Sequence, residues 1–112
     1  MNNITELLPV SDDDRRMLFE YGNGTNWKVS KILIAKKDCV VGKHYHKKKT
    51  EMFFLIKGKI SYCMIGDKVT TNIIPYTKIL INKNIYHEFH LTKGSILIGL
   101  CDKFFDPKDE LK

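Results

Sequence analysis

Short apolar runs, separated by turn-forming residues, dominate the chain from Trp27 onward. Glycine, asparagine, aspartate and lysine occupy the breaks between the runs, as is typical of turns and loops. No segment shows a long apolar repeat of helical period. The pattern predicts β-strands at residues 27–35, 52–56, 60–65, 68–74, 79–81, 86–91 and 95–101. Seven or eight short strands with turns between them favour a sandwich or a closed barrel.

Two turns carry signals of their own. Gly66-Asp67 lies between two predicted strands and is a two-residue hairpin signal of the kind that begins with glycine. Asp106-Pro107, close to the C-terminus, predicts a short tail or a helical turn. The sequence therefore places one barrel domain at residues 27–112, ending in a short C-terminal tail.

Residues 1–26 give a less definite pattern. Ser11, followed by three aspartates, fits a helix N-cap with acids in the first turn, and Gly22 fits the end of such a helix. Residues 15–21 fit an edge strand equally well. We expect a short irregular or helical N-terminal segment that packs on the barrel, and both alternatives stay open at this point.

Length and composition indicate a single small globular domain. The chain has 112 residues, of which 43% are hydrophobic, which suffices for one core and not for two. No apolar run approaches the roughly 20 residues that span a bilayer, and the first residues lack the features of a signal peptide. Three widely spaced cysteines do not suggest a disulfide framework. We therefore expect a cytoplasmic protein without a membrane partner.

The basic balance needs an explanation. The formal net charge is +6, but only Arg15 and Arg16 among the 19 positive residues are arginines. Proteins that bind nucleic acid usually rely on arginine for bidentate contacts. Lys47, Lys48 and Lys49 fall in a predicted turn, where lysines are common solvent-facing residues. We expect no nucleic-acid partner, although one or two of these lysines fit a contact with the diphosphate of a ligand.

The candidate chemistry begins at His44-Tyr45-His46. Side chains alternate along a strand, so the two imidazoles point to one face and Tyr45 to the other. Glu51 follows after a polar turn, at the start of the next predicted strand. A barrel would present His44, His46 and Glu51 from adjacent strands into one interior, where they could bind a metal ion.

A fourth ligand is expected from a distant strand, because first-row metals take four or more ligands. The segment Tyr86-His87-Glu88-Phe89-His90 supplies the candidates. By alternation, His87 and His90 face opposite ways, so only one of them joins the inward set. Nothing near Cys63 marks a reactive thiolate, and the cysteines fit buried apolar positions.

The spacing His44-x-His46-x4-Glu51-x6-Gly58, with His87 further on, resembles the two motifs of the cupin superfamily. The resemblance covers residues 28–101 and implies a jelly-roll β-barrel whose ion is held by His44, His46, Glu51 and His87. The second motif departs from the family pattern: asparagine stands at position 84, where cupins usually have glycine. Asparagine reaches the left-handed conformation more readily than most residues.

Within the cupins, the sequence is similar to two kinds of enzyme of sugar metabolism. The run from His44 to Glu51 resembles the zinc-bearing cupin domain of capsule-biosynthesis enzymes that epimerise a UDP-linked keto-sugar. The segment from Tyr86 to His90 resembles the dTDP-keto-sugar 3,4-ketoisomerases, which are not thought to need a metal. The resemblance implies a sugar nucleotide or phosphorylated sugar as ligand, a homodimer, and zinc as the ion. Iron, nickel and manganese also suit the donor set.

The resulting hypothesis is isomerisation or epimerisation of a nucleotide-linked keto-deoxysugar in polysaccharide biosynthesis. Such chemistry needs a base beside a carbonyl and an ion that stabilises the enolate. Glu51, His90 and Tyr62 are the candidate catalytic residues, and the sequence does not choose among them. Two alternatives remain: a non-catalytic sugar-binding cupin and a metal-dependent dioxygenase.

Overall fold

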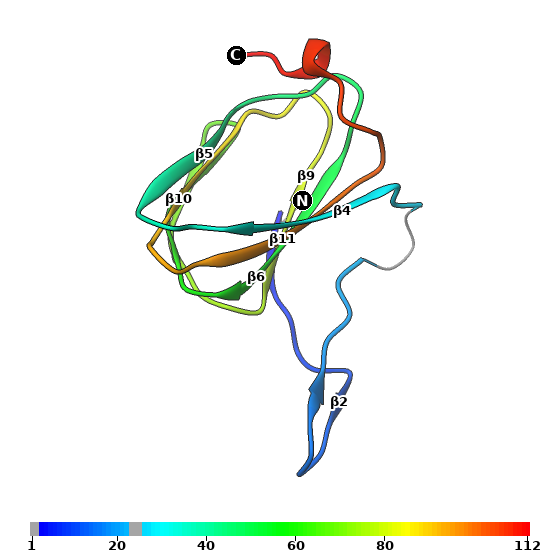
Figure 1. Cartoon of the computed structure of the whole chain (residues 1–112), viewed down its shortest axis with the longest axis vertical. Helices are drawn as coiled ribbons and strands as arrows, with labels where there is room; N and C mark the ends of the chain where they lie inside the picture. Colours follow the sequence, from blue (N-terminus) through cyan, green and yellow to red (C-terminus); the bar gives the residue numbers. More distant parts are fainter. Residues whose placement is uncertain (1–2, 23–25) are drawn as a thin grey trace.

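Two antiparallel sheets face each other and enclose the core in the computed structural model, which describes residues 3–22 and 26–112 (Figure 1). One sheet has the strand order β1 (Ile4–Glu6), β9 (Thr77–Ile81), β6 (Glu51–Lys57), β11 (Ile96–Cys101) and β4 (Val29–Ile34). The other has the order β5 (Cys39–His44), β10 (His87–Leu91), β7 (Ile60–Ile65) and β8 (Lys68–Ile73). The all-β fold predicted from the sequence is confirmed.

Strand alternation places the core between these sheets. In β6, Phe53 and Leu55 point inward and meet Phe89 of β10 and Ile60 of β7 from the opposite sheet. Phe53 and Phe89 pack edge to face with their ring centroids 5.1 Å apart. The register of these strands thus fixes which side chains line the barrel interior.

The turns follow the chemistry of their sequences. Gly66 has a φ of +62° and joins β7 to β8, as the Gly66-Asp67 hairpin signal predicts. Asn84 has a φ of +65°, so asparagine does occupy the left-handed conformation there. Pro107–Asp109 forms a single 3-10 turn, η1, whose N-cap is Asp106. The helical turn predicted at the C-terminus is confirmed.

The N-terminal segment is extended: residues 3–22, as far as the structure describes this segment, contain strands and no helix. Strand β1 pairs with β9 at the edge of the five-stranded sheet. Phe19 stacks on Tyr76 and Tyr21 stacks on Phe54, so that Phe54 is only 3% exposed although it points away from the barrel interior. Of the two alternatives left open by the sequence, the extended one is therefore observed.

Between these contacts, a small hairpin extends beyond the barrel. It consists of β2 (Ser11–Asp12) and β3 (Met17–Leu18), which pair only with each other (Figure 1). In the described part of the chain, no helix is long and apolar enough to cross a membrane.

Candidate functional site

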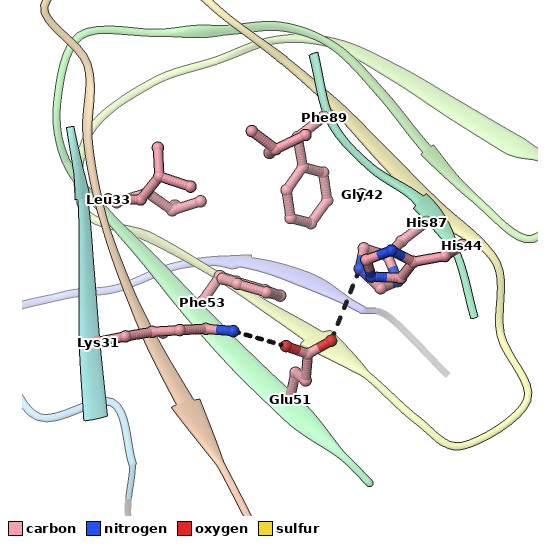
Figure 2. Close-up of a pocket in the computed structure, with 11 residues that line it drawn as sticks. Lys31, Leu33, Gly42, His44, Glu51, Phe53, His87 and Phe89 are labelled. Atoms are coloured by element: carbon pink, nitrogen blue, oxygen red, sulfur yellow. Dashed lines mark hydrogen bonds and ion pairs between the residues drawn. The ribbon is translucent and has the colours of Figure 1, made fainter. Parts of the chain in front are cut away.

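A cavity of about 210 Å³ lies between the two sheets (Figure 2). Its walls are apolar and are formed mainly by Leu33, Val41, Phe53, Phe89 and Leu97. One end is polar and carries His44, Glu51, His87 and Lys31. The cavity thus combines apolar walls with a few convergent polar groups, as small-molecule sites usually do.

The predicted quartet of ligands comes together at this polar end. His44, His46, Glu51 and His87 each offer a donor atom, and these atoms all lie within 4.8 Å of one another. Glu51 Oε1 lies 3.2 Å from His46 Nε2 and 3.6 Å from His87 Nε2. Three of the four residues are buried, and His44 is partly exposed. Residues from three separated segments of the chain thus form one cluster.

A bulge in β5 directs His44 into the cluster. His87 is paired with His44, whereas Glu88 is paired with Gly42, which leaves Lys43 as the extra residue. Gly42 and Lys43 both have positive φ, at +89° and +62°. Val41 and His44 therefore both line the cavity although they are three residues apart, which simple alternation forbids. Apart from Gly42 itself, no residue in this stretch predicts the bulge.

His46 reaches the cluster by a different route. Strand β5 ends at His44, and Tyr45 forms only an isolated bridge with Leu111. His46 is nevertheless 3% exposed, and its Nδ1 lies 2.8 Å from the carbonyl oxygen of Asp109. Strand alternation alone thus does not account for the orientation of His46, because the C-terminal turn also holds it.

The cluster has a distinct charge state. Burial would raise the pKa of Glu51, but His46, Lys31 and His87 outweigh it and lower this pKa to about 2. Burial lowers the pKa of His87 to about 4. Burial and, to a lesser extent, the neighbouring His46 lower the pKa of His44. At neutral pH the site therefore holds a carboxylate and at least two neutral imidazoles, which is the protonation state that metal binding requires.

Unpaired polar atoms test whether these residues fit a metal ion. Glu51 Oε1, His46 Nε2 and His87 Nδ1 are buried without a hydrogen-bond partner. The Nδ1 atom of His46 must carry its proton, since a carbonyl oxygen only accepts, and its Nε2 therefore presents a lone pair to Glu51 unless a second proton binds. Two acceptors 3.2 Å apart in a buried site are stabilised by a positive charge between them, which either a proton on His46 Nε2 or a metal ion supplies. A divalent ion fits this site, and the nitrogen and oxygen donor set suits zinc, iron, nickel or manganese.

Lys31 is a site residue that the sequence analysis missed. It lies in β4, and its Nζ lies 3.3 Å from Glu51 Oε2 and 5.9 Å from the centre of the Phe53 ring (Figure 2). The side chain crosses β11 at Gly99, which is paired with Lys31 on one side and with Phe53 on the other. Lys31 alternates with Val29 and Leu33 on the inward face of β4, and a lysine in that apolar series was the available signal.

Two of the three candidate catalytic residues lie elsewhere. His90 of β10 and Tyr62 of β7 are directly paired and contact each other with ring centroids 4.8 Å apart. They do not line the cavity. His90 Nε2 hydrogen-bonds to Glu88, which also accepts a hydrogen bond from Tyr86 Oη. Of the catalytic candidates, only Glu51 is at the cavity.

The lysine turn is partly buried. Lys47 and Lys48 are exposed, as expected of a turn. Lys49, however, is only 7% exposed, so the expectation that all three lysines face solvent is wrong. Its positive charge lowers the pKa of the Glu51 carboxyl group, although less than His46, Lys31 and His87 do. The electrostatic attraction of Glu51 gives a physical reason for the burial.

Two facing antiparallel sheets, with a histidine and carboxylate cluster inside the barrel, define a jelly-roll cupin. The family model described as WxcM-like, C-terminal (FdtA) matches residues 19–112. The chain therefore belongs to this family.

Solved structures share the fold at low sequence identity. WlaRB, a TDP-quinovose 3,4-ketoisomerase from Campylobacter jejuni, is 19% identical with a TM-score of 0.82, over 96% of this chain and 89% of that one. A dTDP-4-dehydrorhamnose 3,5-epimerase from Bacillus anthracis is 17% identical with a TM-score of 0.72, over 88% of this chain and 71% of that one. The capsular polysaccharide assembling protein CapF from Staphylococcus aureus is 20% identical with a TM-score of 0.65, over 90% of this chain but only 31% of CapF. No curated protein matches the chain.

Proposed function

We propose that this protein isomerises or epimerises a nucleotide-linked keto-deoxysugar in polysaccharide biosynthesis, with a divalent metal ion bound by His44, His46, Glu51 and His87. The observation that carries the proposal is the convergence of these four donors at the polar end of an apolar cavity. Structural neighbours described as TDP-sugar 3,4-ketoisomerases and as a sugar epimerase support the substrate class.

The size of the cavity supports a sugar ring as the part of the substrate that enters. Its volume of about 210 Å³ lies below the range of about 300–1,000 Å³ that is usual for whole drug-sized ligands. A hexose ring is smaller than such a ligand, and the nucleotide would remain outside. Phe53 and Phe89 offer apolar surface for the 6-deoxy methyl group, while Glu51 and His44 face the oxygenated side.

The reaction requires proton transfer beside a carbonyl group. Removal of the proton at C3 of a 4-keto sugar gives an enediolate with its negative charge on O4. Transfer of the O3 proton to O4 and return of a proton to C4 then leave the carbonyl at C3 and a hydroxyl group at C4. A bound divalent ion would act as a Lewis acid that stabilises the negative oxygen. The ammonium group of Lys31 adds positive charge at the same end of the cavity.

Glu51 and His44 are the candidates for moving the proton. Glu51 is ionised, because its pKa is about 2, and His44 is the least buried member of the quartet. Glu51 can bind the ion through Oε1, beside His46, and keep Oε2, beside Lys31, for the proton. His44 can act as the base only while its ring nitrogen is not bound to the ion. We assign no proton transfer to His90 or Tyr62, because they do not line the cavity.

Solvent deuterium exchange tests the reaction directly. Incubation in D₂O with UDP- or dTDP-4-keto-6-deoxyhexoses should introduce deuterium at C4 of a 3-keto product. Reversal of the reaction, or epimerisation, should introduce it at C3 of the 4-keto sugar, and proton NMR detects both. In variants shown to retain the metal, Glu51→Gln should abolish the exchange if Glu51 is the base, whereas His44→Asn should do so if the base is His44. Plasma mass spectrometry should find about one metal ion per wild-type chain and none in a His44→Ala/His87→Ala variant.

Other outcomes would change the assignment. Binding of a keto-sugar without any exchange would favour a sugar-binding cupin. Oxygen uptake with iron and a candidate substrate would favour a dioxygenase. An absence of exchange across the whole panel of sugars would rule out the isomerase proposal.

We also propose that two copies of the chain form a dimer through the N-terminal hairpin. Leu8 and Val10, which lead into the hairpin, are 86% and 57% exposed, and a two-stranded hairpin alone is marginally stable in water. Ile32 and Ile34 point outward from edge strand β4 and are 68% and 62% exposed. The hairpin of one copy would cover this apolar surface of the other.

The tip of the hairpin carries both charges. Asp13 and Asp14 are followed there by Arg15 and Arg16, all exposed, and Arg15 lies 3.9 Å from the Asp13 carboxylate. The dimer proposal therefore rests on the apolar surfaces alone. The three cysteines are free, which fits the reducing cytoplasm that we propose as the location of the enzyme.

A further inference from the structure

The C-terminal turn lies against the loop that carries His46. This turn, η1, comprises Pro107–Asp109, and Asp106 caps it by accepting a hydrogen bond from the Lys108 N–H. The carbonyl oxygen of Asp109 accepts a hydrogen bond from His46 Nδ1 at 2.8 Å, although the two residues are more than sixty positions apart in the sequence. The last residues of the chain thus touch the candidate metal site.

Contacts on both sides of His46 hold the turn in place. The Asp109 carboxylate accepts hydrogen bonds from the backbone N–H groups of Lys47 and Lys48, at 2.9 Å and 3.1 Å. Tyr45 and Leu111 exchange two backbone hydrogen bonds, at 2.8 Å and 3.0 Å. Asp109 is only 6% exposed, so these charge-assisted hydrogen bonds are sheltered from water. His46 is therefore clamped between an anchored residue before it and two anchored residues after it.

Strand pairing does not extend to His46, because β5 ends at His44. The backbone there is held by a hydrogen bond from the Asn84 N–H to the His46 carbonyl oxygen, at 2.6 Å, and by the contacts of the C-terminal turn on either side. A carbonyl oxygen cannot donate, so the hydrogen bond to Asp109 selects the tautomer with the proton on Nδ1. The lone pair on Nε2 then points toward Glu51, which lies 3.2 Å away. In metal sites, an acceptor that orients the far nitrogen of a histidine in this way raises metal affinity.

We propose that Asp109 is a positioning residue whose carboxylate anchors the C-terminal turn, so that its own carbonyl oxygen holds His46 in the Nδ1–H tautomer with Nε2 free for a ligand. The part of this proposal that concerns metal affinity rests on the proposed function. The part that concerns the tautomer does not, because it is a property of the metal-free protein.

The tautomer can be measured without metal. Long-range proton–nitrogen correlation spectra of EDTA-treated protein distinguish the two imidazole nitrogens, and a His46→Asn variant assigns the signals. In the wild type, Nδ1 of His46 should carry a proton. Asp109→Ala should shift the ring toward the form with its proton on Nε2, because Glu51 Oε1 lies 3.2 Å from that nitrogen and accepts a hydrogen bond. Asp109→Asn should retain the wild-type form, because its amide oxygen accepts the same backbone hydrogen bonds.

A matched control uses the other end of the barrel. Asp38 also accepts a hydrogen bond from a backbone N–H across the fold, that of Lys93 at 2.8 Å, but it precedes β5 and is remote from His46. Asp38→Ala should leave the His46 tautomer unchanged. If Asp109→Ala does not fold, Pro107→Gly offers a milder loosening of the same turn, and it should shift the tautomer part of the way.

Cobalt titration followed by visible absorption measures the effect on metal affinity. Asp109→Ala should weaken cobalt binding about 10–100-fold relative to wild type, and Asp109→Asn and Asp38→Ala should not. A His46 tautomer unchanged in both folded Asp109→Ala and Pro107→Gly would overturn the proposal. Wild-type protein that shows the Nδ1–H tautomer but binds no metal would support the positioning role while refuting the metal-dependent part of the proposed function.

Discussion

Gly42 lies directly against His87 across the pair β5–β10. A Cβ atom at position 42 would come within 2.7 Å of the His87 carbonyl oxygen and 3.0 Å of its Cδ2 atom. The φ of Gly42 is +89°, which residues with a side chain rarely adopt. The bulge that turns His44 into the cavity therefore depends on a residue without a side chain, for reasons of both conformation and space.

We expect Gly42→Ala to destabilise the fold and to weaken metal binding. The conformational strain alone is worth about 1–2 kcal/mol, and displacement of His87 adds to it. Gly94→Ala is the matched control, since Gly94 has a φ of +86° but no atom within 4 Å of the added Cβ. Urea unfolding of both variants separates the two effects. Equal destabilisation, with equal cobalt affinity, would mean that the contact with His87 is unimportant.

Replacement of Lys31 by methionine should separate metal binding from catalysis. Methionine keeps an apolar stem over Gly99 and Phe53 but removes the positive charge near Glu51. The pKa of Glu51 should rise, because Lys31 lowers it. Cobalt should bind several-fold more tightly, since a repelling cation is lost, whereas deuterium exchange into the sugar should slow.

The control for this variant is Lys28→Met. Lys28 also lies over an aromatic ring, with its Nζ 5.8 Å from the centre of Phe104, but it does not line the cavity. Neither cobalt affinity nor exchange rate should change. A Lys31→Met enzyme with wild-type exchange would remove Lys31 from the proposed mechanism.

Local rules predicted most of the barrel. The strand Ile60–Ile65, the Gly66 turn and the left-handed Asn84 all follow from the preferences of the residues at those positions. The quartet His44, His46, Glu51 and His87 was predictable because its spacing carries the resemblance to cupins. Such features depend either on residues close together in the sequence or on a spacing of residues that is typical of one fold family.

Features that depend on distant contacts were not predictable in this way. The Asp109 carbonyl reaches His46 only because the C-terminal turn folds back on the lysine loop. Lys31 of β4 reaches Glu51 of β6 across the intervening strand β11. This is possible because Gly99 of β11, which lies beside Lys31, has no side chain. The outward position of His90 followed correctly from alternation relative to His87, yet it still left open whether His90 takes part in catalysis.

Metal removal should lower the thermal stability of the wild-type protein. An ion present at about 100 times its Kd stabilises the folded state by about 2.7 kcal/mol, because it binds the assembled quartet and not the unfolded chain. EDTA should therefore lower Tm, and added zinc should restore it. The His44→Ala/His87→Ala variant should respond to neither. An identical Tm with EDTA and with zinc in the wild type would count against a structural metal site.

Acidification should destabilise the metal-free protein in two steps. His87 has a pKa of about 4 against an ordinary 6.5, so the unfolded chain binds the extra proton first and stability falls between pH 6.5 and 4. Glu51 has a pKa of about 2 against 4.5, so stability falls further between pH 4.5 and 2. Each step is worth at most about 3 kcal/mol.

Urea unfolding across this pH range, in EDTA, measures both steps. His87→Asn should flatten the dependence between pH 6.5 and 4, and Glu51→Gln should flatten it between pH 4.5 and 2. The opposite assignment, or a wild-type protein whose stability is constant from pH 7 to 4, would contradict the charge state described for the cluster.

The proposed dimer depends on the outer surface of β4. An Ile32→Lys/Ile34→Lys variant places two charges where the hairpin of a second copy would pack, so sedimentation velocity should show a monomer in place of the wild-type dimer. Val69→Lys is the control, because Val69 is 49% exposed on β8, an edge strand of the other sheet. That variant should remain dimeric. If the double variant also remains dimeric, the two copies pair through a different surface, and the exposed hairpin residues must be covered in another way.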